Sequence, residues 1–254
     1  MPLHSLFDLS GRTALVTGSS RGIGAAIAKG LAAAGASVIV HGQSKNATAA
    51  TCEAISADGG TAFSIDADLA APNAGSHLIE QALGFTNRLD ILVINASAQV
   101  NATLDDLTCE DLDLQLAVNL RSTLAMLQAV LPKMSAQKWG RVVSIGSINQ
   151  SRPKSIVTAY AATKAAQHNI IQGQARDYAK HNVLLNTLSP GLIDTDRNAD
   201  RKNADPEGWQ RYAAELNWMG RAGTAEEMVG AALFLASDAC SFMTGETIVL
   251  SGGY

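Results

Sequence analysis

Near its N-terminus the chain passes from a short apolar segment directly into a glycine-rich turn, an order that few folds accommodate. Residues Thr13–Thr17 are apolar or β-branched, as in a buried strand, and the run GSSRGIG occupies positions 18–24. Apolar residues Ile23, Ile27 and Leu31 then recur at helical spacing. The order of strand, glycine turn and helix is typical of the first unit of a nucleotide-binding α/β fold.

Apolar, β-branched segments alternate with stretches of helical periodicity along the whole chain. This alternation predicts an α/β fold, a doubly wound parallel sheet of the Rossmann type with helices on both faces. No linker, charge block or repeat divides the 254 residues, so we expect a single domain over residues 1–254. The predicted strands are Thr13–Thr17, Ser37–Val40, Ala62–Ile65, Ile91–Asn95, Arg141–Ile145, Val183–Leu188 and Thr247–Leu250.

Charge and cysteine content argue against several classes of partner. The chain carries 19 basic and 23 acidic side chains, which leaves no positive surplus for nucleic acid or an anionic membrane. Cys52, Cys109 and Cys240 lie far apart and show no metal-binding spacing, so neither disulfides nor a metal site are expected. Because the N-terminus has no signal-like apolar run and no apolar stretch reaches membrane-spanning length, we expect a cytoplasmic protein.

The glycine turn itself predicts a nucleotide ligand. Glycines let a pyrophosphate approach backbone N–H groups, and the N-terminus of the following helix favours negative charge. The predicted contacts in this turn are Gly18, Ser20, Arg21, Gly22, Ile23 and Gly24.

The second predicted strand indicates which dinucleotide binds. NAD requires an acidic residue about 20 positions after the glycines, but no Asp or Glu occurs from Ala25 to Cys52. Instead, Ser44 and Lys45 follow the strand, and Arg21 lies within the turn. Their hydroxyl and cationic groups suit a 2'-phosphate. We therefore predict NADP(H) as the cofactor, with NAD(H) as the alternative.

A second group of residues carries candidate chemistry. Tyr160 and Lys164 are separated by four positions, so on a helix they share one face. An ammonium beside a phenol favours the phenolate and lowers the pKa of the phenol. Ser147 follows the predicted strand Arg141–Ile145, which places its hydroxyl at the carboxyl edge of the sheet, where ligands of such sheets bind.

The glycine turn, Ser147, Tyr160 and Lys164, in this order, resemble the motifs of the short-chain dehydrogenase/reductase family, and the resemblance covers nearly the whole chain. The chain looks similar to 3-oxoacyl reductases and sugar dehydrogenases of this family. The resemblance implies that Asn119 completes a catalytic tetrad with Ser147, Tyr160 and Lys164 by supporting a water and the lysine in a proton relay. It also implies that Tyr160 and Lys164 contact the cofactor.

Further cofactor contacts follow only from the resemblance. The sequence departs from the family motifs at two positions. Ser97 replaces the glycine that follows Asn95-Ala96 in the family, and Ser251 replaces the aspartate that often precedes the paired glycines near the C-terminus. The implied contacts are Asp68 and Leu69 at the adenine, Asn95 and Ala96 near the ribose, and Pro190, Gly191, Ile193 and Thr195 around the nicotinamide.

The activity implied by the resemblance is hydride transfer between a nicotinamide and a carbonyl or secondary alcohol, with Tyr160 as general acid or base. A sugar or polyol dehydrogenase working in the oxidation direction is the main alternative. A non-catalytic NADP(H)-binding sensor and an epimerase or dehydratase are the others.

The substrate and the assembly are less constrained by the sequence. Residues 192–220 lack clear periodicity and are expected to form a substrate loop. A polar, hydroxylated or carboxylated small molecule, or an acyl chain on a carrier, would suit the predicted substrate residues. The family implies a homo-oligomer, a tetramer, with one dimer contact through helices at Asp111–Met134 and Ser155–Lys180. The candidate substrate residues are Gln99, Asn149, Gln150, Arg152, Trp209, Tyr212 and Trp218, among which Arg152 could bind an anion.

Overall fold

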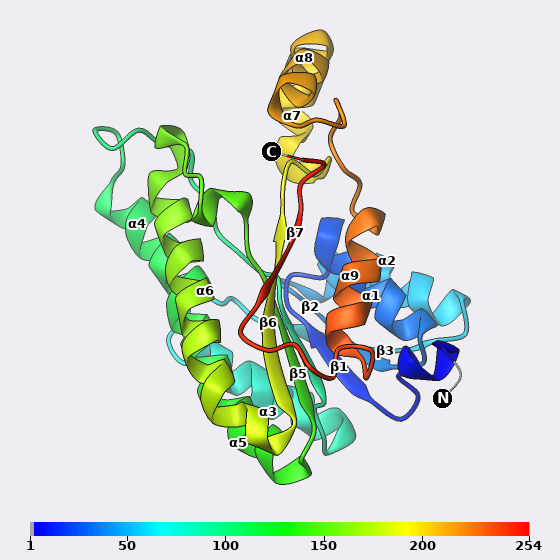
Figure 1. Ribbon diagram of the computed structural model, residues 1–254. Coiled ribbons are helices and arrows are strands. Elements are labelled where there is room, and N and C mark those ends of the chain that lie inside the picture. The colour runs from blue at the N-terminus through cyan, green and yellow to red at the C-terminus, as the bar shows by residue number, and fades with distance from the viewer. Residues whose placement is uncertain (1–2, 254) are drawn as a thin grey trace.

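A seven-stranded parallel sheet in the order β3-β2-β1-β4-β5-β6-β7 lies at the centre of the computed structural model, which describes residues 3–253 (Figure 1). The predicted fold class and all seven predicted strands are confirmed, with ends displaced by at most two residues. The strands are β1 (Thr13–Val16), β2 (Ser37–Gly42), β3 (Thr61–Asp66), β4 (Ile91–Ile94), β5 (Gly140–Ile145), β6 (Val183–Pro190) and β7 (Thr247–Leu250).

Helices cover both faces of the sheet. Helices α1 and α9 pack on one face, with α2 beside α1, while α3, α5 and α6 pack on the other (Figure 1). The helices are α1 (Gly22–Ala33), α2 (Lys45–Ala57), α3 (Ala74–Thr86), α4 (Cys109–Leu116), α5 (Ser122–Gln137), α6 (Thr158–Tyr178), α7 (Ala199–Ala204), α8 (Pro206–Leu216) and α9 (Val229–Ala236). Short helical turns are η1 (Leu3–Leu6), η2 (Ala117–Arg121), η3 (Ile148–Gln150), η4 (Ser155–Val157), η5 (Ala179–His181), η6 (Asp196–Asn198) and η7 (Glu226–Met228).

The central strands are buried on both sides, which explains their continuous apolar sequences. Every residue of β1, β4, β5 and β6 is buried. Strands covered by helices on both faces need apolar side chains at successive positions rather than at alternate ones. Two apolar clusters result, one on each face of the sheet, and they hold the strand ends that form the site.

The segment at residues 192–220, which we expected to form a substrate loop, is largely helical. The segment contains η6, α7 and α8 and rises above the carboxyl edge of the sheet (Figure 1). Asp205 caps α8 by accepting from the N–H of Gly208 at 2.8 Å, and Pro206 occupies its first turn. After this cap, Trp209, Tyr212, Ala213 and Leu216 recur at helical spacing, so the sequence did carry a helix signal that the prediction of a loop missed.

One helical stretch, Cys109–Gln137, is long and apolar enough by composition to cross a membrane, and half of its most apolar window is buried in the protein. Within it, α5 packs against α3 and places Met126, Val130 and Met134 in the core. The buried apolar side chains of this stretch therefore serve contacts inside the fold.

A buried carboxylate organises the opposite, amino-terminal edge of the sheet. Asp90 is fully buried and accepts from the N–H of Thr13 at 2.9 Å and from Arg88 Nε and Nη2 at 2.8 and 2.5 Å. Arg12 lies 3.5 Å from the same carboxylate. These bonds fix the start of β1 beside that of β4.

We expect Asp90→Ala to lower the free energy of unfolding by about 2–3 kcal/mol, because it removes bonds to charged groups and leaves the Thr13 N–H without an acceptor. Urea unfolding measures this loss. Asp105→Ala, at an exposed position, is the control and should change stability little. Equal stabilities of the two variants would contradict the assignment.

Candidate active site

The glycine turn fits closely against the end of β4. Gly18 has φ +61°, and a Cβ there would lie 2.9 Å from the Cα of Ala96. A Cβ on Gly24 would collide with Asn95 Nδ2 and with the carbonyl oxygen of Gly18. At Gly18 and Gly24 there is therefore no room for a side chain, so the backbone of the turn is exposed to a ligand. The turn leads into the N-terminus of α1. This cradle fits a pyrophosphate group.

Side-chain bonds join this turn to the segment after β4. Thr17 Oγ1 accepts from the N–H groups of Asn95 and Ala96 at 2.9 and 3.0 Å. Asn95 Nδ2 donates to the carbonyl oxygens of Thr17 and Gly18, both at 2.9 Å. The predicted cofactor residues of the two segments thus form one unit, and Ser97 leaves these bonds intact.

His41, which the sequence analysis missed, supports the turn from below. The N–H of Gly18 donates to His41 Nδ1 at 3.0 Å, so the proton resides on Nε2, which donates to the carbonyl oxygen of Ala67 at 3.1 Å. Burial holds the pKa of His41 below its usual value of 6.5, which keeps the ring neutral and Nδ1 available as an acceptor. A polar residue at the end of the buried strand β2 was the available signal.

The three residues predicted to contact the 2'-phosphate lie at the N-termini of two helices. Ser44 caps α2, its hydroxyl accepting from the N–H of Ala47 at 3.3 Å, and Lys45 begins the same helix. Arg21 stands at the start of α1, exposed, with Nε 3.8 Å from Asp196. Ser44 and Lys45 therefore lie together, while the guanidinium of Arg21 turns toward the segment after β6.

Tyr160 and Lys164 lie on α6 as predicted, and both are buried. Lys164 Nζ donates to the carbonyl oxygen of Ile145 at 2.7 Å and to Gln167 Oε1 at 3.0 Å, and it lies 5.9 Å from the centre of the Tyr160 ring. Burial, with a smaller contribution from the positive charge of Arg197, lowers the pKa of Lys164 to about 7. The ammonium is thus poised to lose its proton near neutral pH.

Ser147 follows β5 and caps η3, where hydrogen bonds hold its hydroxyl in place. Its Oγ accepts from the N–H of Asn149 at 3.2 Å, and its own N–H donates to Gln150 Oε1 at 3.3 Å. Together these form a capping box at the start of η3. The side-chain oxygen of Asn149 is buried and accepts no hydrogen bond from residues 3–253.

Asn119 lies in η2, a π-helical turn between α4 and α5. Its amide nitrogen donates to the carbonyl oxygen of Ala98 and to Thr163 Oγ1, each at 2.9 Å. Its backbone carbonyl accepts from Gln167 Nε2 at 3.3 Å, and Gln167 also accepts from Lys164. Gln167, another residue missed from the sequence, links the predicted tetrad residues Asn119 and Lys164. Its position three residues after Lys164 on one helix was the signal.

The segment after β6 reaches the glycine turn. The N–H of Gly191, after Pro190, donates to the carbonyl oxygen of Leu250 at 2.8 Å, and Ile193 is buried. Thr195 stands opposite Gly22, where a Cβ would lie 3.5 Å from Thr195 Cγ2. Asp68 and Leu69, the two residues predicted to contact the adenine, lie in different environments. Asp68 is exposed, whereas the side chain of Leu69 is buried in the core.

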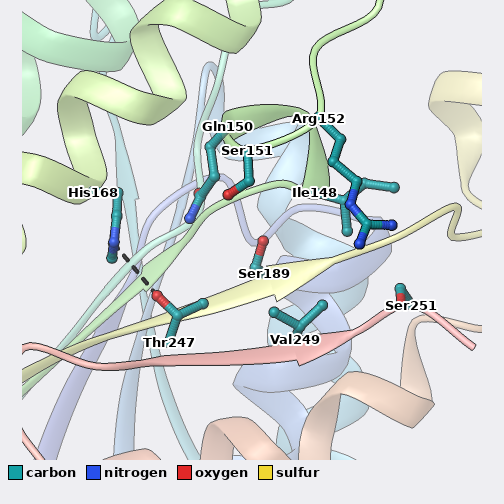
Figure 2. A pocket seen from close by; sticks show the side chains of 9 residues that line it. All are labelled: Ile148, Gln150, Ser151, Arg152, His168, Ser189, Thr247, Val249 and Ser251. Carbon is teal, nitrogen blue, oxygen red and sulfur yellow. Dashed lines mark hydrogen bonds between the residues drawn. The ribbon is translucent and has the colours of Figure 1, made fainter. Parts of the chain in front are cut away.

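The predicted substrate residues do not gather in one place. Arg152 and Gln150 line a pocket of about 300 Å³ with His168, Ser189 and Val249, beside β6 and β7 (Figure 2). None of the predicted tetrad residues lines this pocket. Elsewhere, Gln99 lies after β4, bonded to Arg197; Trp209 is buried in α8 and packs against Tyr212; and Trp218 is exposed.

Comparisons with known proteins settle the family. The profile of the family described as enoyl-(acyl carrier protein) reductase matches residues 18–254. The chain belongs to the short-chain dehydrogenase/reductase family. It is 36% identical to gluconate 5-dehydrogenase of Gluconobacter oxydans (strain 621H), over 98% of this chain and 96% of that protein. It is 35% identical to a 3-oxoacyl-(acyl-carrier-protein) reductase of Aquifex aeolicus (strain VF5), over 96% of this chain and 98% of that protein.

A solved structure is more similar still. The crystal structure of a 3-oxoacyl (acyl-carrier-protein) reductase from Agrobacterium tumefaciens C58 with NADP bound is 70% identical to this chain, with a TM-score of 0.98 and coverage of 100% of this chain and 98% of that one. This short-chain dehydrogenase/reductase is therefore an oxidoreductase, as the motifs predicted.

Replacing Lys164 with methionine removes a buried ammonium whose protonation opposes folding. The pKa is about 7 in the folded chain against an ordinary 10.5, so the unfolded state binds more protons between these values. Stability of the wild type consequently rises with pH through that window, and below it the full cost of burial remains.

We therefore expect Lys164→Met to gain stability relative to the wild type at low pH and to lose this advantage as the pH rises from about 7 to about 10. Urea unfolding across this range is the measurement. Lys180→Met, at an exposed lysine near the end of α6, is the control. A stability difference that does not vary with pH would refute the buried ammonium.

Proposed function

We propose that this protein is an NADP(H)-dependent oxidoreductase that reduces a carbonyl group to a secondary alcohol. The observation that carries the proposal is the placement of Ser147, Tyr160 and the Lys164–Gln167–Asn119 chain at the sheet edge that also bears the glycine cradle. In this function the whole chain acts as one dinucleotide-binding oxidoreductase domain.

When bound, the coenzyme supplies a hydride from its nicotinamide ring. Tyr160 gives its phenolic proton to the carbonyl oxygen and takes it back in the oxidation direction. Ser147, whose hydroxyl accepts from the Asn149 N–H, has its own proton free to donate to the same oxygen. Lys164 holds positive charge beside the phenol and is positioned by Gln167, which accepts from Lys164 and donates to the carbonyl oxygen of Asn119. Water near Lys164 and Asn119 returns the proton to Tyr160, because the amide of Gln167 cannot itself pass one on.

Tyr160→Phe removes the proton donor while keeping the ring, so we expect NADPH affinity to change less than twofold and kcat to fall by about 10³-fold. Steady-state reduction of a carbonyl panel and a fluorescence titration measure the two quantities. Tyr178→Phe, on the same helix, is the matched control and should keep kcat. Wild-type turnover in Tyr160→Phe would overturn the assigned role.

The phosphate of NADP(H) is assigned to Arg21, Ser44 and Lys45. We expect NADPH to bind at least tenfold more tightly than NADH, a difference of about 1.4 kcal/mol. Arg21→Ala should remove most of this preference and leave NADH affinity nearly unchanged, because the guanidinium has no 2'-phosphate to contact in NADH. Lys29→Ala, an exposed cation of α1, is the control. Tighter binding of NADH to the wild type would reverse the assignment.

A second candidate is an NADP-dependent sugar or sugar-acid dehydrogenase working toward oxidation. The 36% identity to a gluconate 5-dehydrogenase favours it. The same residues serve both directions, so initial rates with NADPH plus ketones and with NADP plus polyols separate the two.

We further propose a cytoplasmic homotetramer that acts on small molecules and on neither nucleic acid nor membranes. Exposed apolar side chains on α4, α5 and η4 support a subunit contact where the sequence predicted one. These side chains are Leu112, Leu114, Leu116, Leu124 and Ile156.

A further inference from the structure

Arg197 is an exposed residue of η6 whose guanidinium reaches the segment after β4. Its Nη1 donates to Gln99 Oε1 at 3.2 Å, and its Nη2 lies 3.2 and 3.0 Å from the carbonyl and hydroxyl oxygens of Ser97. These bonds occupy three of the five N–H donors of a guanidinium and leave two for a ligand.

No carboxylate within residues 3–253 forms an ion pair with Arg197. The acidic neighbours in its own segment are engaged elsewhere, since Asp194 binds Lys202 at 2.5 Å and Asp196 faces Arg21 at 3.8 Å. The three acceptors of Arg197 are neutral. An anion placed there would consequently meet an uncompensated positive charge.

The segment that Arg197 binds is connected to the catalytic residues. Arg197 itself lies close enough to Lys164 to act on that buried ammonium, whose own hydrogen-bond partners, Ile145 and Gln167, are also neutral. Ser97, which anchors Arg197, follows Asn95 and Ala96 at the cradle, and Ala98 is bonded to Asn119. Arg197, although exposed, is therefore bonded to the short segment that joins the glycine cradle to Asn119.

We propose that Arg197 binds a carboxylate of the substrate, so that this enzyme acts on small oxo acids and the corresponding hydroxy acids rather than on uncharged carbonyl compounds. The inference rests on the proposed function. In the reaction a hydride from NADPH adds to the keto carbon and a proton from Tyr160 adds to its oxygen, while the carboxylate keeps its charge and its bonds to Arg197.

This assignment replaces Arg152 as the predicted anion ligand. Arg152 lines the pocket at β6 and β7, which none of the tetrad residues touches (Figure 2). Arg197, by contrast, contacts a segment that carries both a cofactor residue and a partner of Asn119.

The test compares acetoacetate with its uncharged ethyl ester in NADPH-dependent reduction by the full-length protein. We expect Arg197→Met to raise KM for acetoacetate at least tenfold, to change KM for the ester less than twofold, and to leave NADPH affinity unaltered. Arg197→Lys should restore part of the loss, because it keeps the charge but not the guanidinium and its remaining donors. Arg211→Met, an exposed arginine of α8 paired with Glu207, is the matched control.

The other outcomes are distinct. Equal losses for acid and ester in Arg197→Met would show that Arg197 only holds its segment in place, and weaker NADPH binding would assign it to the coenzyme; either overturns the inference. A wild type that reduces the ester as well as the acid also overturns it but leaves the proposed function standing. A wild type that reduces no carbonyl compound with NADPH overturns the proposed function itself.

Discussion

Parallel pairing of β1 with β4 in the middle of the sheet is the constraint on which the site depends. The strand order changes direction there, with β2 and β3 on one side and β5 to β7 on the other. Ligands of open α/β sheets bind where such a change occurs. Because the strands are parallel, the glycine turn after β1 and Asn95 after β4 leave the same edge as neighbours, and the bonds of Thr17 and Asn95 fasten them. A shift in this pairing would separate the cradle from Ser147 and Tyr160.

The segment after β6 spans this edge through two consecutive residues. Asp196 faces Arg21 on the glycine turn, and Arg197 bonds Ser97 and Gln99 after β4. The pair with Arg21 is long and exposed, so it contributes little to stability. The bonds of Arg197 are shorter and involve two neighbouring residues on one segment. The Arg21–Asp196 pair is therefore weaker than the bonds of Arg197. A 2'-phosphate can replace Asp196 as the partner of Arg21 while Arg197 still holds the segment after β6 to Ser97 and Gln99.

Sequence patterns were sufficient for the strands and for placing Tyr160 and Lys164 on one helix, but not for contacts between distant elements. Buried parallel strands are continuous apolar runs, and Tyr160 with Lys164 is a spacing on one helix, so both are local features. His41 and Gln167 matter through bonds to Gly18 and to the carbonyl of Asn119, 23 and 48 residues away, which no local pattern encodes. The same holds for Arg197 and Ser97, 100 residues apart, although the departure at Ser97 was visible in the sequence.

A carboxylate bound to Arg197 would change the protonation state of Lys164. A lysine with a pKa of about 7 is only partly charged at neutral pH, yet it must be charged to favour the phenolate of Tyr160. Burial is the main cause of the low pKa and Arg197 the second. A carboxylate bound to Arg197 offsets that second cause and adds negative charge near the ammonium, so it raises the pKa of Lys164. An anionic substrate would thus promote the protonation state that its own reduction needs, whereas an uncharged carbonyl compound would leave Lys164 as it is in the free protein.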